Sequence, residues 1–192
     1  MRGRALAEEL TQLLAAEITS EYRVESHLEL RFESHYLRFL MPTTRGTERG
    51  SKKRYAGTVR RPDATTHLVV CGLEAVRRDW TPLARRVQRE LLRRVFADEP
   101  FEEWLVTIAR DLVAGRLDEE LVYRKRVRDS EGATSEVEYV MTTRGPGPIG
   151  GRSVPLDHDH YVAKQLAPVC EVVLPMLGTS FARIAGAQTS LF

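Results

Sequence analysis

Cysteine is scarce in this sequence: the 192 residues contain only Cys71 and Cys170, which lie far apart in the chain. Such a pair forms neither a disulfide framework nor the closely spaced ligands of a zinc site. Long hydrophobic runs are also missing, and the N-terminal stretch places three glutamates soon after its two arginines. That pattern argues against a signal peptide or a membrane span. Together these absences predict a protein of the reducing cytoplasm.

Catalytic motifs are missing as well. No histidine, cysteine or serine lies in a nucleophile motif, no glycine-rich phosphate loop opens a helix, and no pair of aspartates marks a two-metal site. The run from Leu156 to Tyr161 holds two acids and two histidines, but their spacing spreads them around the first turn of a helix. Asp157 as a helix N-cap explains the run more simply than a metal site does. We therefore expect no catalytic residue and no metal ligand in this sequence.

The net charge of +2 indicates no partner by itself, but the charges are unevenly distributed. Between Arg45 and Arg61 seven cations accompany a single acid, and between Arg77 and Arg94 seven arginines accompany two acids. Segregated basic blocks of this kind indicate a face that binds a polyanion. The alternative is that both blocks are ordinary solvated surface, which on a strand hairpin discourages edge-to-edge aggregation.

The hydrophobic pattern of the first part predicts one helix followed by several strands. Apolar residues recur at helical spacing over 5–18, whereas apolar and charged residues alternate over 27–33, which predicts a half-buried strand. Further strands are expected at 36–41, 53–59 and 67–71, with a turn at Pro62 and Asp63 between the last two. A helix followed by strands indicates the α+β class.

The second half is mainly helical by the same criteria. Thr81 followed by Pro82 marks a strong helix start, and a second helix is expected over 101–114. The remaining expected elements, in chain order, are a strand at 137–142, a glycine- and proline-rich linker at 145–151, a helical region after Asp157 that bends near Pro168 and Pro175, and a mobile tail at 186–192.

Two short segments carry the strongest functional signals. Residues 50–57 place three consecutive cations, Lys52, Lys53 and Arg54, before Tyr55 on a glycine-bounded strand. Cations on a strand can face phosphates, and the tyrosine offers a flat surface for a base or sugar. The segment 188–192 ends in two adjacent apolar residues, which suits docking in an apolar pocket of a partner or folding back onto its own domain.

A series of short motifs runs through the whole chain: Leu28-Glu29-Leu30, Phe39-Leu40-Met41-Pro42, Gly50 to Gly57, Gly72-Leu73-Glu74, Val76 to Ala84, Leu121 to Arg126, Ser153 to Asp157, Tyr161, Lys164 to Pro168 and the C-terminal peptide. In this collinear order they resemble the C-terminal part of family B DNA polymerases, and within that family the bacterial DNA polymerase II branch. The resemblance implies the end of a palm domain over 1–78, a mainly helical thumb over 79–185 and a clamp-binding tail over 186–192.

The resemblance also implies roles for individual residues. Lys53 and Tyr55 match a Lys-x-Tyr element that touches the newly paired primer end along the minor groove, where correct base pairs present similar acceptors. The expected activity is magnesium-dependent, template-directed nucleotidyl transfer in DNA replication or repair. Contacts to primer–template DNA are expected from Lys52, Lys53, Tyr55, Arg77, Arg78, Arg85, Arg89, Arg124, Lys125 and Arg126, and contacts to a sliding clamp from Gln188, Leu191 and Phe192.

Three departures from the family pattern limit this expectation. The catalytic aspartates, the nucleotide-binding fingers and the exonuclease precede the matched region, so a second chain would have to supply them together with the magnesium sites. Cys71 stands where the bacterial relatives carry a lysine, and the stretch 128–137 is shorter than theirs. Two alternatives to a polymerase subunit stay open: a non-catalytic module that binds DNA and the clamp, and an inert remnant of a truncated gene.

Overall fold

The structure is a computed structural model that describes residues 2–43, 50–51, 53–128, 132–150 and 154–186. The described part combines helices with two three-stranded sheets, which confirms the α+β prediction. The chain divides into two compact units, Met1–Leu37 with Val59–His67, and Arg38–Thr58 with Leu68–Phe192. The expected DNA-contacting residues that the structure describes all belong to the second unit.

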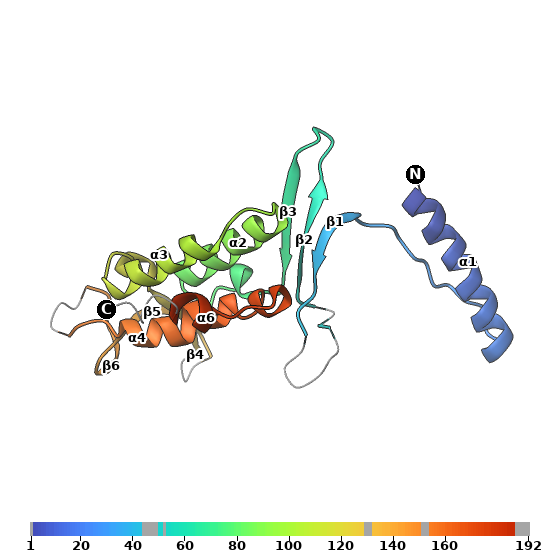
Figure 1. Ribbon diagram of the computed structural model, residues 1–192. Coiled ribbons are helices and arrows are strands. Elements are labelled where there is room, and N and C mark those ends of the chain that lie inside the picture. The colour runs from blue at the N-terminus through green and yellow to red at the C-terminus, as the bar shows by residue number, and fades with distance from the viewer. Residues whose placement is uncertain (1, 44–49, 52, 129–131, 151–153, 187–192) are drawn as a thin grey trace. The chain divides into compact units, whose positions relative to one another are not determined.

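The first unit begins with α1 (Arg2–Tyr22), coloured blue in Figure 1. This helix confirms the prediction made from the periodicity over 5–18, yet none of its described residues is buried. Leu6 and Leu13 are 55% and 60% exposed. Helical spacing of leucines therefore predicts the element correctly, whereas burial depends on what the leucine stripe packs against.

The prediction of a half-buried strand over 27–33 is wrong. The segment adopts no regular secondary structure, and its three apolar side chains are 38% to 48% exposed. It lies along α1 instead: the Leu30 amide donates to Thr11 Oγ1 at 3.1 Å, and the Phe32 ring covers Gly3. An alternating sequence forms a strand only where a neighbouring strand takes up its backbone hydrogen bonds. No strand in the described ranges pairs with this segment.

Three strands form the first sheet, in the order β1 (Tyr36–Leu40), β2 (Tyr55–Arg60) and β3 (Thr66–Cys71). They confirm the three strands predicted at 36–41, 53–59 and 67–71. In the turn between β2 and β3, the Thr65 amide donates to Asp63 Oδ1 at 2.9 Å, and the Arg61 amide donates to the Thr65 carbonyl at 2.8 Å. The predicted turn at Pro62 and Asp63 is therefore confirmed.

The helix α2 (Pro82–Phe96) begins as its sequence predicts. Thr81 is the N-cap, because its side-chain oxygen accepts a hydrogen bond from the Ala84 amide at 3.3 Å, and Pro82 occupies the first turn. A 3-10 turn, η1 (Glu74–Val76), precedes α2, and α3 (Glu102–Val113) follows it. The two helices bury their apolar stripes in one core, which includes Leu83, Val87, Leu91, Leu105, Ile108 and Leu112.

The second sheet follows a 3-10 turn, η2 (Asp118–Glu120), and contains β4 (Tyr123–Arg128), β5 (Thr134–Thr142) and β6 (Gly145–Gly147). The strand β5 confirms the prediction at 137–142. The predicted linker over 145–151 is wrong in its first three residues, because they pair with β5 in the register Val140↔Gly147. Gly145 permits the reversal with a φ of 106°, which side-chain-bearing residues rarely adopt.

The C-terminal region is a series of short turns of helix: α4 (His158–Tyr161), a π-helical turn η3 (Val162–Leu166), α5 (Ala167–Cys170), a 3-10 turn η4 (Leu174–Leu177) and α6 (Phe181–Gly186). Pro168 explains the irregularity, because it has no amide to donate to the Lys164 carbonyl. The Gln165 side chain donates to that carbonyl instead, at 3.2 Å. The helical region predicted after Asp157 is confirmed, and the helix type changes beside Pro168 and Pro175. Residues 187–192 of the predicted tail lie outside the described residues.

Helix packing sets which face of α2 reaches the surface. The helix packs against α5, and α3 packs against α6, so the buried stripes of these helices face one core. The remaining face of α2 carries its arginines toward solvent. None of the described helices combines the length and the apolar character needed to cross a bilayer.

Candidate nucleic-acid interface

The first candidate group, Lys53 and Tyr55, lies at the start of β2. Lys53 is exposed, whereas Tyr55 is half-buried, with its ring centroid 5.6 Å from that of Phe39 on β1. The sheet therefore holds the tyrosine ring on one side and leaves the lysine ammonium in solvent. Lys52, which the sequence assigns to the same group, lies outside the described residues.

Gly72 fixes the backbone beside this group. Its φ of 62° is left-handed, and a Cβ atom at this position would lie only 2.0 Å from the Lys53 carbonyl oxygen. Only a glycine fits between the two segments. Arg54 adds a second connection, because its guanidinium pairs with the Glu74 carboxylate two residues after Gly72. The segment after β3 thereby holds the Lys53 backbone in place.

Four of the seven arginines between Arg77 and Arg94 are paired with acids. The pairs are Arg77 with Asp79, Arg86 with Glu120, Arg93 with Glu90 and Glu99, and Arg94 with Glu90. A DNA phosphate would have to displace a carboxylate to reach these guanidiniums, which makes them poor contacts for a duplex backbone. The basic block is thus smaller than its sequence indicates.

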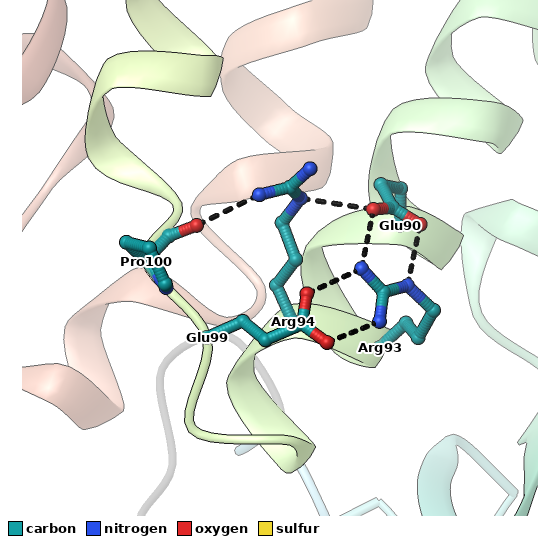
Figure 2. Close-up of polar contacts among 5 residues, drawn as sticks. All are labelled: Glu90, Arg93, Arg94, Glu99 and Pro100. Carbon is teal, nitrogen blue, oxygen red and sulfur yellow. Dashed lines mark hydrogen bonds and ion pairs between the residues drawn. The ribbon is translucent and has the colours of Figure 1, made fainter.

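Figure 2 shows the densest cluster of these pairs, at the end of α2. Glu90 accepts hydrogen bonds from Arg93 Nε at 2.8 Å and from Arg94 Nε at 2.9 Å, and Arg94 also donates to the Pro100 carbonyl at 2.8 Å. The Arg94 guanidinium lies 5.0 Å from the centroid of the Trp104 ring. The hydrogen bond from Arg93 lowers the pKa of Glu90, and the hydrogen bonds to its two acids raise the pKa of Arg93. These contacts connect α2 to the start of α3.

Arg78, Arg85 and Arg89 differ from the paired arginines, because none of them meets an acid at ion-pair distance within the part of the chain that the structure describes. Arg85 and Arg89 lie one turn apart on α2, and the Arg85 Nε atom is buried with no hydrogen-bond acceptor there. A buried N–H without a partner is costly, but this atom has almost no accessible surface, so a phosphate would contact the part of the Arg85 guanidinium that lines the hollow. The two arginines line an open hollow of about 450 Å³ together with Ala75, Pro82, Arg86 and Glu90.

The third candidate group, Arg124, Lys125 and Arg126, lies on β4 in the second sheet. Arg124 Nε donates to Glu138 Oε1 across the strands at 2.7 Å, and Arg126 lies opposite Glu136 in the register. Lys125 lies opposite Val137, on the other face of the sheet. Glutamates therefore offset the charge of the two arginines, and Lys125 is the better candidate for a phosphate contact.

Aromatic stacking anchors the start of β4. Tyr123 stacks on Tyr139 and Tyr161 at centroid distances of 5.2 and 5.6 Å, and its hydroxyl lies 2.9 Å from His160 Nε2. Burial raises the pKa of Tyr161 to about 12 and raises the pKa of Tyr123 as well. Both phenols are therefore neutral at neutral pH, and the cluster is a structural anchor for the strand that carries the third candidate group.

Asp157, His158 and His160 near α4 each have a separate partner. Asp157 is the N-cap that the sequence predicts, since its Oδ1 accepts from the His160 amide at 2.9 Å. His158 Nε2 lies 2.7 Å from Asp118 Oδ1, and the His160 ring contacts the Tyr123 hydroxyl. Within the described ranges, no group of three or more histidine, cysteine, aspartate or glutamate residues could hold a metal ion.

Sequence reasoning missed the polar residues that connect β2 to α2, namely Arg54, Glu74 and Gln88. Glu74 and Gln88 are only 6% and 0% exposed. The available signal was the position of Gln88, which interrupts the apolar face of α2 beside Val87. A polar side chain on a buried helix face needs a hydrogen-bond partner from another element. The expected clamp contacts, Gln188, Leu191 and Phe192, lie outside the described residues.

Comparisons with known proteins identify several relatives. The model of the family described as DNA polymerase family B matches residues 5–144. DNA polymerase II of Escherichia coli (strain K12) is 40% identical over 99% of this chain and 28% of its own length. The DNA polymerase delta catalytic subunit of Bos taurus is 30% identical over 80% of this chain and 17% of its own length. A DNA polymerase of Desulfurococcus sp. (strain Tok) is 26% identical over 81% of this chain and 23% of its own length. The chain thus spans less than a third of each of these relatives.

Proposed function

Because the chain belongs to DNA polymerase family B, we propose that its 192 residues hold the primer–template duplex during template-directed DNA synthesis. The observation that carries this proposal is the pair Arg85 and Arg89, which lack an acidic partner among the described residues and line a hollow beside Ala75. Through Glu74 and Arg54, the same hollow is connected to the Lys-x-Tyr element of the family. The arginine pair on α2 and the Lys53–Tyr55 pair at the start of β2 are therefore joined through the ion pair of Arg54 with Glu74.

Phosphate binding is the role that best fits the arginines of the hollow. Arg85 and Arg89 lie one turn apart on α2, both line the hollow, and neither forms an ion pair within the described residues. Contacts of this type bind the DNA backbone without regard to sequence and weaken as salt rises, because binding releases condensed counterions. Exposed Arg78 and Lys125 extend this set, whereas Arg77, Arg124 and Arg126 contribute less because glutamate or aspartate offsets their charge.

Lys53 and Tyr55 would supply the contact that depends on correct base pairing. In the minor groove all Watson–Crick pairs present acceptors at similar positions, so a lysine there senses pairing geometry and not sequence. The half-buried Tyr55 ring would pack against a sugar or base. In this proposal residues 1–78 form the end of the palm and residues 79–185 the thumb.

We assign catalysis to polypeptide outside these 192 residues. In the family, the catalytic aspartates, the fingers and the exonuclease precede the region that this chain matches, so in this proposal they come from elsewhere together with the metal ligands. The segment with Gln188, Leu191 and Phe192 would dock on a sliding clamp and raise processivity through effective concentration. A non-catalytic module that binds DNA and the clamp is the second candidate, because the described candidate residues are all suited to binding.

The duplex contact is tested by replacing Lys53 and Tyr55 with alanine in the whole chain. Binding of a labelled primer–template duplex should weaken more than about tenfold, and the slope of log affinity against log salt concentration should become shallower by about one. Arg144→Ala, which removes an exposed cation outside the candidate groups, serves as the control and should leave the salt titration unchanged. A salt titration of the double variant that superimposes on that of the wild type would reject the Lys-x-Tyr assignment.

Catalysis and clamp docking are tested separately. The 192-residue chain alone should not extend a primer with magnesium, whereas addition of a family B polypeptide that carries the catalytic aspartates should restore extension. Extension by the single chain would contradict the assignment of catalysis, and no extension by the mixture would favour the non-catalytic module. Deleting Leu191 and Phe192 should abolish clamp pull-down and leave duplex binding intact.

A further inference from the structure

We propose that Glu74 is a positioning residue that fixes the Lys53–Tyr55 element relative to the arginine face of α2. This inference rests on the proposed duplex-holding function, and it assigns a role to residues that would not touch DNA themselves. Arg54, Glu74 and Gln88 form a continuous polar connection from β2 through η1 to α2. Because of this connection, a displacement of the Lys53–Tyr55 element would also displace the arginine face of α2.

The Glu74 carboxylate is the centre of this connection. Its side chain is 8% exposed, and each of its oxygens has a separate partner. Oε1 accepts from the Arg54 guanidinium, and Oε2 accepts from Gln88 Nε2 at 2.8 Å. A buried carboxylate is costly unless it is paired and hydrogen-bonded, so removal of either partner would destabilise its present position.

Gln88 extends the connection to two further elements. It is fully buried, its Oε1 accepts from the Ala75 amide at 2.6 Å, and its Nε2 also donates to the Val169 carbonyl at 3.2 Å. Both amide hydrogens and the carbonyl oxygen of the side chain are therefore used. One glutamine thus holds η1, α2 and α5 together, and a fully satisfied buried network of this kind specifies a single arrangement of its elements.

The positions of the DNA-facing groups along the chain explain how this network would act on them. Arg54 stands between Lys53 and Tyr55, and its side chain is directed inward to Glu74. On α2, Gln88 directly precedes Arg89 and follows Arg85 by almost one helical turn. A displacement within the pair of Glu74 and Gln88 would therefore shift the lysine and tyrosine relative to the two arginines.

The negative charge of Glu74 has a second effect on the site. Arg54 is half-buried, and its Nε atom has no hydrogen-bond partner in the described part of the chain. With a neutral residue at position 74, the Arg54 guanidinium would be a poorly compensated charge and would turn toward solvent or a phosphate. That movement would rotate the backbone between Lys53 and Tyr55. Glu74 therefore keeps Arg54 away from the DNA-facing surface.

A double-mutant cycle in the whole chain tests the proposal, with affinity for a labelled primer–template duplex as the measurement. Lys53→Ala should weaken binding about tenfold in the wild type, but less than about threefold in a Glu74→Gln background, because the lysine is no longer in position there. Glu99→Gln, which removes a similar carboxylate from Arg93, is the matched control. Lys53→Ala should keep its tenfold effect in that background.

A rescue variant separates positioning from loss of folding. Arg54→Gln combined with Glu74→Gln removes both charges, allows neutral hydrogen bonds and should recover part of the affinity that Glu74→Gln alone loses. Circular dichroism melts of every variant set a temperature at which all are folded. If Lys53→Ala costs the same tenfold in both backgrounds, Glu74 does not position the lysine. If Lys53→Ala has no effect even in the wild type, the Lys-x-Tyr assignment is wrong, and Glu74 has no lysine contact to position. If the wild-type chain does not bind the duplex at all, the duplex-holding function itself is wrong.

Discussion

Arg93 and Arg94 at the end of α2 differ from Arg85 and Arg89 near its start, although all four are arginines on one helix. At the end of the helix, Glu90 and Glu99 accept hydrogen bonds from these guanidiniums (Figure 2). Arg94 also lies over the Trp104 ring. Nearer the start, Arg85 and Arg89 line a hollow that also contains Glu90, but neither forms an ion pair with an acid in the described ranges. An arginine-rich helix is therefore not a uniform DNA-binding surface, because the acids around it decide which of its cations remain available.

The largest expected effect comes from replacing the two arginines near the start. Arg85→Ala combined with Arg89→Ala should weaken duplex binding about 10- to 100-fold and reduce the salt slope by about two contacts, because two phosphate contacts are lost. Arg93→Ala combined with Arg94→Ala should change affinity by less than about twofold. Fluorescence anisotropy at several salt concentrations measures both. Equal losses for the two double variants would remove the distinction between the two ends of the helix.

The free energy of unfolding should depend more on Arg94 than on Arg89, which is the reverse of the order expected for duplex binding. Arg94→Ala should lower the free energy of unfolding by about 1–2 kcal/mol, because it removes the contacts to Glu90, the Pro100 carbonyl and the Trp104 ring. Arg89→Ala should change it by less than about 0.5 kcal/mol, since the side chain is exposed. Urea unfolding of both variants gives the comparison. A larger loss for Arg89→Ala would mean that the exposed arginine has a structural partner.

The smallest expected effect is a pH dependence at the paired end. The pKa of Glu90 lies below its unfolded value of 4.5, so the unfolded state binds its proton more tightly than the folded state does. The stability that Glu90 contributes is fully present above pH 4.5 and is lost as pH falls through the lower, folded pKa. Glu90→Gln should therefore cost up to about 1 kcal/mol near neutral pH and less at a pH below 4.5, where the Glu90 carboxylate begins to bind a proton. Urea midpoints at the two pH values measure this, and a constant difference would contradict it.

The sequence predicted those elements whose signals are local. Thr81 and Pro82 mark the start of α2 through a side-chain cap and a fixed φ, and both act within one turn of helix. The strand expected over 27–33 was wrong because alternation describes one chain only, whereas a strand needs a neighbour. The short strand β6 was missed for the converse reason, since its pairing with β5 outweighs its glycines and proline.

The candidate site was predictable as a set of residue types and not as a set of contacts. Lys53, Tyr55 and the arginines of α2 were identified from charge and motif. Arg86, however, pairs with Glu120 across 34 positions of sequence, and no local pattern reveals that partner. The same limit explains why Gln88 was missed, because its three hydrogen bonds reach η1 and α5. Long-range polar contacts decide which predicted cations are available.

The Trp104 ring, which lies against Arg94, makes the end of α2 observable by intrinsic tryptophan fluorescence. The sequence contains two tryptophans, and the other, Trp80, directly precedes the N-cap Thr81 and packs against the core. Each end of α2 therefore has its own indole, one near the arginines proposed to meet DNA and one within the salt-bridge cluster. Two single-tryptophan variants, Trp80→Phe and Trp104→Phe, would let intrinsic fluorescence follow the two ends of one helix separately, without any attached label.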